Sequence, residues 1–257
     1  MLGSLLGIPE SDRARFDPWV RGLTRLQNAG FAVEEITDAF ASVAEMYAYF
    51  SDVIAARRAE PTDDLLGALV AAEVDGERLS DWDILGFCFV MVAGGNDTTG
   101  NLISHGVMLL DGDHAARERL HGAPELIPGA LLEFLRLESS VQGLSRLTTR
   151  PVVVGDTEIP EGVKVMMLYG SGNRDEREFG PDAAQLNVTR EVKRHLAFSS
   201  GAHFCIGSHF ARLQARVAFE ELLARQPQLG VDVAGGQRLH SSFVHGWITL
   251  PASGIVP

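Results

Sequence analysis

One long helical pattern near the middle of the chain constrains the fold more than any other feature. It opens with a capping box at Ser80 and continues as an apolar helix to about Leu110. The segment 93–100 interrupts it with glycine, asparagine, aspartate and threonine. Gly94 and Gly95 alone cost roughly 2 kcal/mol of helix stability relative to alanine. A sequence selected only for stability would avoid this interruption.

Two explanations of the interruption stay open. In one, the helix ends near Gly95 and a turn follows. In the other, the helix continues with a local distortion that makes room for a ligand and presents Asp97 and Thr98 to it. Apolar residues resume after Gly100, which favours a continuous helix.

The flanking segments predict a mainly helical chain with a minor β part, an α+β organisation in the broad sense. Apolar spacing and end signals predict helices over 33–59, 124–138 and 207–225. Strands with tight turns are predicted within 150–169, an irregular segment over 170–197 and short β pieces over 238–250.

Composition and charge narrow the class of protein. A net charge of −12 over 257 residues argues against a nucleic-acid-binding protein. The two cysteines, Cys88 and Cys205, form no disulfide framework, which fits a reducing cytoplasm. The apolar run 84–95 is too short for a membrane span, and the first residues make a poor signal peptide. We therefore expect a soluble cytoplasmic protein with no membrane span.

The second unusual segment is the loop 198–207, which a helix follows at once. Cys205 lies near the start of that helix, where the helix dipole and free backbone N–H groups favour an anionic sulfur. Gly201 and Gly207 permit a tight turn and the close approach of a flat partner. Against this, a lone cysteine is often only a small buried apolar residue. Zinc is disfavoured because no second cysteine lies nearby.

Glu133 and Arg136 lie three residues apart on one face of the helix predicted over 124–138. Taken alone, such a pair is a solvated ion pair that contributes roughly 0.2–0.5 kcal/mol.

Together these segments resemble the cytochrome P450 family. The segment 94–98 matches its glycine-rich acid–threonine pattern, and Glu133 with Arg136 matches Glu-x-x-Arg. The loop 198–207 matches the Phe-x-x-Gly-x-His-x-Cys-x-Gly pattern, with Ser199 where the family usually has glycine. Each motif is weak alone, but their order, with Asn-Arg-Asp at 173–175 between them, is specific.

The resemblance implies a cytochrome P450 fold of the soluble bacterial type, with a long central helix, a cysteine-ligand loop and small β-sheets. The chain would be one domain, 1–257, with a helical pocket-lid region at 1–75 and the haem-binding core at 76–257. It would be the C-terminal part of the fold, because the helices and strands expected before residue 1 are absent from the sequence.

The resemblance also implies roles for residues. Cys205 would be the axial thiolate of haem b, Asp97 and Thr98 would deliver protons, and Gly94 and Gly95 would leave space over the haem. Glu133 and Arg136 would be a buried structural pair completed by Arg190. The remaining implied residues contact the cofactor (Arg146, Phe198, Gly201, His203 and Gly207) or line an apolar substrate pocket (Val141, Leu144, Phe243 and Val244).

The implied activity is that of a monooxygenase that uses dioxygen, an apolar small-molecule substrate and electrons from a ferredoxin-type partner. A basic patch would receive this partner, formed by Lys193, Arg194, His195, Arg212 and Arg216. Two alternatives stay open: a truncated, catalytically inert fragment of such an enzyme, and a helical ligand-binding or interaction module without haem.

Overall fold

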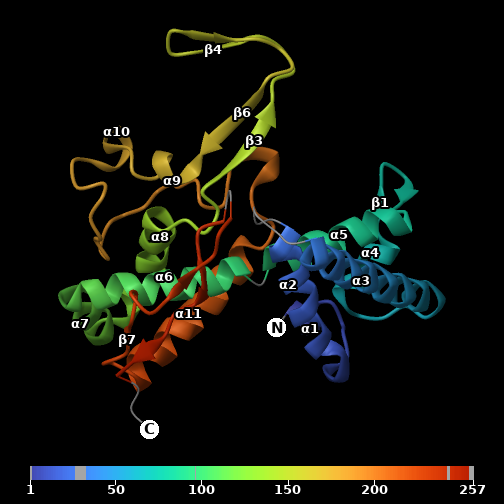
Figure 1. Cartoon of the computed structure of the whole chain (residues 1–257), viewed down its shortest axis with the longest axis horizontal. Coiled ribbons are helices and arrows are strands. Elements are labelled where there is room, and N and C mark those ends of the chain that lie inside the picture. Colours follow the sequence, from blue (N-terminus) through green and yellow to red (C-terminus); the bar gives the residue numbers. More distant parts are fainter. Residues whose placement is uncertain (1, 27–32, 96, 242–243, 255–257) are drawn as a thin grey trace. The chain divides into compact units, whose positions relative to one another are not determined.

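A computed structural model describes residues 2–26, 33–95, 97–241 and 244–254, in two units that divide after Asp97. Figure 1 colours the first unit, Met1–Asp97, from blue to teal. Its elements are α1 (Leu2–Leu5), the 3-10 helix η1 (Glu10–Arg15), α2 (Phe16–Leu26), α3 (Val33–Ala59), α4 (Leu65–Ala71), β1 (Glu73–Val74), β2 (Glu77–Arg78) and α5 (Asp81–Gly95).

Local end signals place α3, α4 and the start of α5. Helix α3 spans the predicted residues 33–59. Asp64 caps α4, because its carboxylate accepts a hydrogen bond from the Gly67 N–H at 2.8 Å. At the start of α5 the capping box is reciprocal: Ser80 N–H donates to Asp83 Oδ2 at 3.0 Å, and Asp83 N–H donates to Ser80 Oγ at 3.2 Å.

An aromatic cluster forms the centre of the first unit. Trp19 from α2 is fully buried and lies 5.3 Å from the Tyr49 ring and 5.7 Å from the Phe50 ring, centroid to centroid. Ile84 and Cys88 from α5 belong to the same core. Burial of so many large side chains accounts for the tight packing of α2, α3 and α5.

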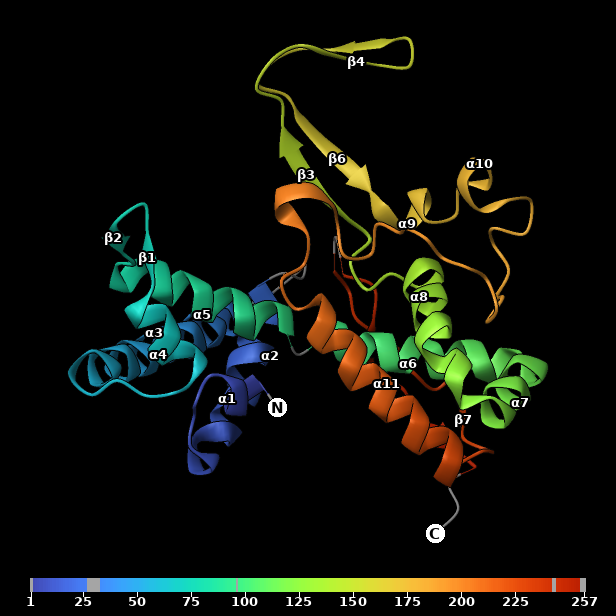
Figure 2. The same ribbon diagram turned by 180° about the vertical axis from the view of Figure 1, so that it is seen from behind.

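Four helices of nine or more residues form the framework of the described part of the second unit, Thr98–Pro257. Helix α11 packs against α7 and α8, as Figure 2 shows. Gly106 makes close packing possible, because a Cβ there would come within 2.4 Å of the Phe219 ring and 2.8 Å of the Phe134 ring. The helices are α6 (Asp97–Gly112), α7 (His114–Gly122), α8 (Ile127–Leu137) and α11 (Ser208–Arg225).

Small antiparallel ladders complete this unit. Strand β3 (Gly143–Leu147) pairs with β6 (Lys164–Leu168), and the hairpin of β4 (Val152–Val154) and β5 (Thr157–Ile159) extends beyond their far end in both views (Figures 1 and 2). The sequence predicts β4 to β6 but not β3. The short elements are α9 (Tyr169–Gly172), α10 (Glu176–Phe179), β7 (Gly230–Val231), β8 (Gln237–Arg238), β9 (Trp247–Thr249) and β10 (Ala252–Ser253), with 3-10 turns at Pro124–Leu126 and Gly201–His203.

The interruption of the central helical pattern falls at the boundary of the two units. Helix α5 ends at Gly95 and α6 begins at Asp97, while Asn96 lies outside the described residues. Helical structure thus occupies both sides of the glycine pair. In the described part of the chain, no helix is long and apolar enough to cross a membrane.

Candidate haem-thiolate site

Backbone hydrogen bonds hold the cysteine loop in a closed turn. The Cys205 N–H donates to the Phe198 carbonyl oxygen at 2.9 Å, and the Phe204 N–H donates to the Gly201 carbonyl oxygen at 3.0 Å. On the other side, the Cys205 carbonyl accepts from the Ser208 N–H at 3.2 Å, in the first turn of α11. The sulfur therefore sits in a fixed turn directly before an 18-residue helix.

The surroundings of Cys205 suit a flat apolar cofactor held through sulfur. Cys205 is free and half-buried, whereas its neighbours Phe204 and Ile206 are 52% and 71% exposed. A Cβ at Gly201 would meet no atom within 4 Å, and one at Gly207 would meet only the Cys205 sulfur, at 3.9 Å. A free thiol beside exposed apolar side chains and open space fits a thiolate-bound haem. Cys88, in contrast, is buried in the core, and burial raises the pKa of its thiol to about 12.

Ser199 occupies a backbone conformation that favours glycine. Its φ is +61°, in the left-handed region. The Ser199 hydroxyl lies 3.0 Å from the Tyr169 hydroxyl, and this contact compensates part of the strain. The loop thus keeps its turn without the glycine that usually occurs there.

Arg146 and His203 are the two cations expected at the edge of the cofactor. Arg146 is half-buried on β3, where its Nη1 donates to the Ser145 carbonyl oxygen at 3.0 Å, and His203 is exposed. In the described parts of the second unit, no acidic side chain forms an ion pair with either residue. Their donors are accessible to an anionic group such as a propionate.

The residues of the interruption divide between the two units. In the first unit Gly94 and Gly95 are exposed, and a Cβ at Gly94 would meet no atom within 4 Å. Asp97 and Thr98 are half-buried in the first turn of α6. The Thr98 carbonyl oxygen accepts a hydrogen bond from the Ser140 hydroxyl at 3.0 Å, which ties this turn to the segment after α8.

Glu133 and Arg136 form a fully buried ion pair, so the solvated pair that their spacing alone predicts is wrong. Arg136 Nε and Nη2 donate to the two carboxylate oxygens of Glu133, both at 2.7 Å. Arg136 Nη1 also donates to the carbonyl oxygens of Asn173 (2.8 Å) and Ala183 (2.6 Å). Every charged atom of this pair has a partner, which a buried charge requires.

Arg190 joins the same cluster. Its Nε donates to Glu133 Oε1 at 3.2 Å, and its Nη2 pairs with Asp182 at 2.8 Å. The cluster thereby connects α8 with the irregular segment that the sequence predicts over 170–197. This connection positions the chain that leads into the cysteine loop.

Two of the residues expected to line a substrate pocket lie side by side. Val141 and Val244 form an antiparallel bridge and are both half-buried. Leu144, on β3, is 39% exposed. Phe243 lies outside the described residues.

The expected basic patch carries less free charge than the sequence suggests. Burial and the charge of Arg212 lower the pKa of His195 to about 4, which disfavours a charge on His195 at physiological pH, and the patch stays a prediction. Arg194 pairs with Glu178 at 2.6 Å, and Arg216 pairs with Glu220 at 2.7 Å.

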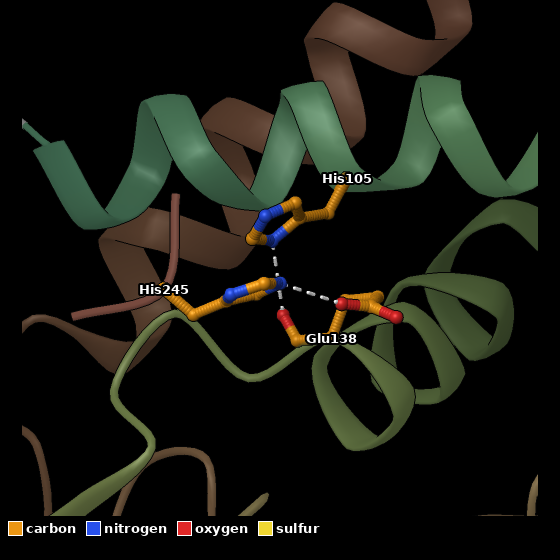
Figure 3. Close-up of side chains that lie close together, drawn as sticks. All are labelled: His105, Glu138 and His245. Carbon is orange, nitrogen blue, oxygen red and sulfur yellow. Dashed lines mark hydrogen bonds and ion pairs between the residues drawn. The ribbon is translucent and has the colours of Figure 1, made fainter. Parts of the chain in front are cut away.

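Sequence reasoning misses a second polar group of this unit, formed by His105, Glu138 and His245 (Figure 3). One imidazole nitrogen from each histidine and one carboxylate oxygen of Glu138 all lie within 4.8 Å of one another, although the residues come from three distant segments. No local motif marks them. The signal that remains in the sequence is a histidine in the otherwise apolar stretch that becomes α6.

Comparisons with known proteins place the chain near one family. The cytochrome P450 family profile matches residues 125–226. Cytochrome P450 130 of Mycobacterium tuberculosis is 48% identical over 228 residues, which cover 88% of this chain and 56% of that protein. The steroid C26-monooxygenase of Mycolicibacterium smegmatis is 35% identical, over 98% of this chain and 63% of that protein.

A solved structure extends the likeness to the fold. CYP109E1 from Bacillus megaterium, in complex with testosterone, superposes with a TM-score of 0.90 at 31% identity, over 99% of this chain and 69% of that one. The chain spans 56% and 63% of the lengths of these two curated relatives.

Proposed function

Because this chain belongs to the cytochrome P450 family, we propose that Cys205 is the axial ligand of haem b in a monooxygenase. The family's cofactor is haem b held by a cysteine thiolate, and when bound it supplies the redox centre at which dioxygen is activated. The observation that carries the proposal is the free, half-buried Cys205 in a fixed turn before α11, beside exposed apolar side chains.

Other residues of the loop and of β3 would bind the cofactor. Arg146 and His203 would donate hydrogen bonds to its propionates, and their lack of acidic partners in the described second unit supports this role. Gly201 and Gly207 would leave room for the ring, and Phe198, whose carbonyl holds the Cys205 N–H, would pack beside it.

Asp97 and Thr98 would handle protons. A carboxyl and a hydroxyl in adjacent positions can pass a proton from solvent toward a reacting oxygen, because each can accept one and release another. Gly94 and Gly95 would keep this part of the helix free of side chains. The Ser140 hydrogen bond to the Thr98 carbonyl would hold the turn in position.

The overall reaction would insert one oxygen atom of dioxygen into an apolar substrate and reduce the other to water, with two electrons and two protons. Val141, Leu144 and Val244 are apolar and would contact the substrate. A steroid monooxygenase among the relatives, and a relative bound to testosterone, support an apolar polycyclic molecule as one candidate class.

Electrons would come from an acidic ferredoxin-type protein in the cytoplasm. The charges that remain for its docking are Lys193 and Arg212, with Arg194 and Arg216 partly neutralised by their glutamate partners. Reversing the charge of Lys193 and Arg212 should slow reduction by such a partner. An unchanged reduction rate would contradict this docking face.

The carbon monoxide difference spectrum tests the haem assignment. The chain is reconstituted with haem, reduced and exposed to carbon monoxide, and a strongly red-shifted Soret band is expected from thiolate ligation. Cys205→Ser should lose the shifted band, whereas Cys88→Ala, the matched control, should keep it. An unshifted band in the unaltered chain would refute the proposal, and failure to take up any haem would support the inert fragment instead.

A further inference from the structure

Three ionisable side chains of the second unit have no role in the site proposed above. His105 comes from α6, Glu138 caps the C-terminus of α8, and His245 precedes β9 (Figure 3). His245 Nε2 lies 3.0 Å from Glu138 Oε2, and His105 Nδ1 lies 3.2 Å from the Glu138 carbonyl oxygen. The two imidazole rings stack, with centroids 4.8 Å apart and planes inclined by 25°.

A metal ion does not suit this geometry. An imidazole ligates through a lone pair in its ring plane, and two stacked, nearly parallel rings cannot direct such lone pairs at one ion. His105 Nδ1 must also carry a proton to donate to a carbonyl oxygen. Positive charge already surrounds the carboxylate, because Arg174 lies 2.9 Å from Glu138 Oε1 and Arg238 lies 3.3 Å from His245 Nε2.

The cluster instead holds the backbone that carries Val141 and Val244. The backbone N–H of His245 donates to the Ser140 carbonyl oxygen at 2.7 Å, next to the Val141–Val244 bridge. Through its hydroxyl, Ser140 also bonds to the Thr98 carbonyl oxygen at 3.0 Å. The two residues expected to contact substrate are thus connected to the turn expected to handle protons.

The chain after His245 is held closely to α6 as well. The Trp247 N–H donates to Asn101 Oδ1 at 3.2 Å. A Cβ at Gly246 would lie only 2.2 Å from the Asn101 side chain, so only glycine allows this approach. The guanidinium of Arg238 lies 3.5 Å from the centre of the Trp247 ring.

His245 Nε2 lies within hydrogen-bond distance of both Glu138 and Arg238, but it cannot bond to both at once. It donates to the Glu138 carboxylate only when it carries the proton, and it accepts from Arg238 only when it does not. Burial alone would raise the pKa of Glu138, but the His245 hydrogen bond and the charge of Arg174 hold that pKa below its usual value. At neutral pH the ionised carboxylate therefore selects the Nε2–H form of His245.

We propose that His245 is a positioning residue: its hydrogen bond to Glu138 and its stacking on His105 hold the Val141–Val244 bridge in place against α6. The substrate-contacting role of that bridge rests on the proposed function, whereas the role of His245 in keeping the bridge in place does not. A hollow of about 450 Å³ opens beside Glu138, His245 and Arg238, so protons can exchange with solvent there.

Amide hydrogen exchange tests whether His245 keeps this backbone in place. His245→Phe keeps a stacking ring but removes the hydrogen bond to Glu138, and exchange at residues 244–247 should rise about tenfold while exchange in α11 stays unchanged. His121→Asn is the control, because His121 also bonds to a carbonyl oxygen (Leu223, 3.0 Å) in the same unit. No change at 244–247, or an equal rise throughout the second unit, would overturn the proposal.

Nitrogen-15 NMR of the imidazoles gives a signature that a general loss of stability would not produce. His245 should carry its proton on Nε2 in the unaltered chain. In Glu138→Ala the proton should move to Nδ1, because Nε2 then accepts from Arg238, whereas Glu138→Gln, which keeps an acceptor oxygen, should retain the Nε2–H form. An unchanged tautomer in Glu138→Ala would overturn the proposal.

Neither measurement requires haem. A chain that fails the carbon monoxide test but shows the local exchange and tautomer changes would refute the haem assignment and support the role of His245. The reverse result would refute only the role of His245.

Discussion

His195 should make the second unit sensitive to mild acid. It lies in the irregular segment before the cysteine loop, where its ring is 5.5 Å from that of Phe198 and its Nδ1 accepts the Ala197 N–H at 3.1 Å. Burial, with a further contribution from the charge of Arg212, lowers its pKa from 6.5 to about 4. The ring is therefore neutral in the folded chain at pH values where it is charged in the unfolded chain.

The sign and size of the effect follow from proton linkage. Between pH 6.5 and about 4 the unfolded state binds a proton at His195 that the folded state does not, so the free energy of unfolding falls as the pH falls. The slope is at most about 1.4 kcal/mol per pH unit. From pH 7 to pH 5 the loss from this one group is about 2 kcal/mol, and it levels off below about pH 4.

His195→Asn isolates this contribution. The asparagine side-chain oxygen can take over the acceptor role of Nδ1 toward Ala197 but cannot titrate, so the variant should lose about 2 kcal/mol less than the unaltered chain between pH 7 and pH 5. Urea-induced unfolding followed by circular dichroism measures both proteins. His105, whose pKa burial also lowers to about 4, contributes to both curves and cancels in the difference.

Equal acid losses in the two proteins would refute the reasoning, because they would mean that His195 is charged in the folded chain. Arg212→Gln provides a second check. Removing this charge should raise the pKa of His195 and reduce the acid loss, without abolishing it, because burial is the larger cause.

Two further predictions concern packing and buried charge in the second unit. Arg136→Leu should lower the free energy of unfolding by about 3–5 kcal/mol, because Glu133 loses its bidentate partner in a fully buried position, and a loss below about 1 kcal/mol in urea unfolding would contradict this. Gly106→Ala should lower it by about 1–3 kcal/mol, since the new methyl would press on Phe219 and Phe134, and a thermal midpoint equal to that of the unaltered chain would show that the rings move aside freely.

The position of α3 and the start of α5 could be predicted from the sequence because their signals are local. The 3.6-residue spacing over 33–59 and the Pro61 stop predict α3, and Ser80 predicts the start of α5 through a hydrogen-bonded pair three residues apart. The cysteine loop is similar: its closing hydrogen bond joins Cys205 to Phe198 within the same motif.

Strand β3 could not be predicted in the same way. Its five residues include glycine, serine and arginine, so neither β propensity nor alternation marks it. It is a strand because β6 pairs with it along its whole length, with Gly143 opposite Leu168 and Leu147 opposite Lys164. Only the position of that partner makes the segment extended.

The same distinction separates the two buried polar groups of the second unit. The sequence identifies Glu133 and Arg136 but, by spacing alone, places them in solvent, because the carbonyl groups that complete their environment come from residues about 40 positions away. For His245 the sequence does not even indicate the partner, since Glu138 lies 107 positions before it. A buried polar side chain is stable only with partners, and when those partners are distant in the chain, the sequence can show that a residue is unusual without showing what it contacts.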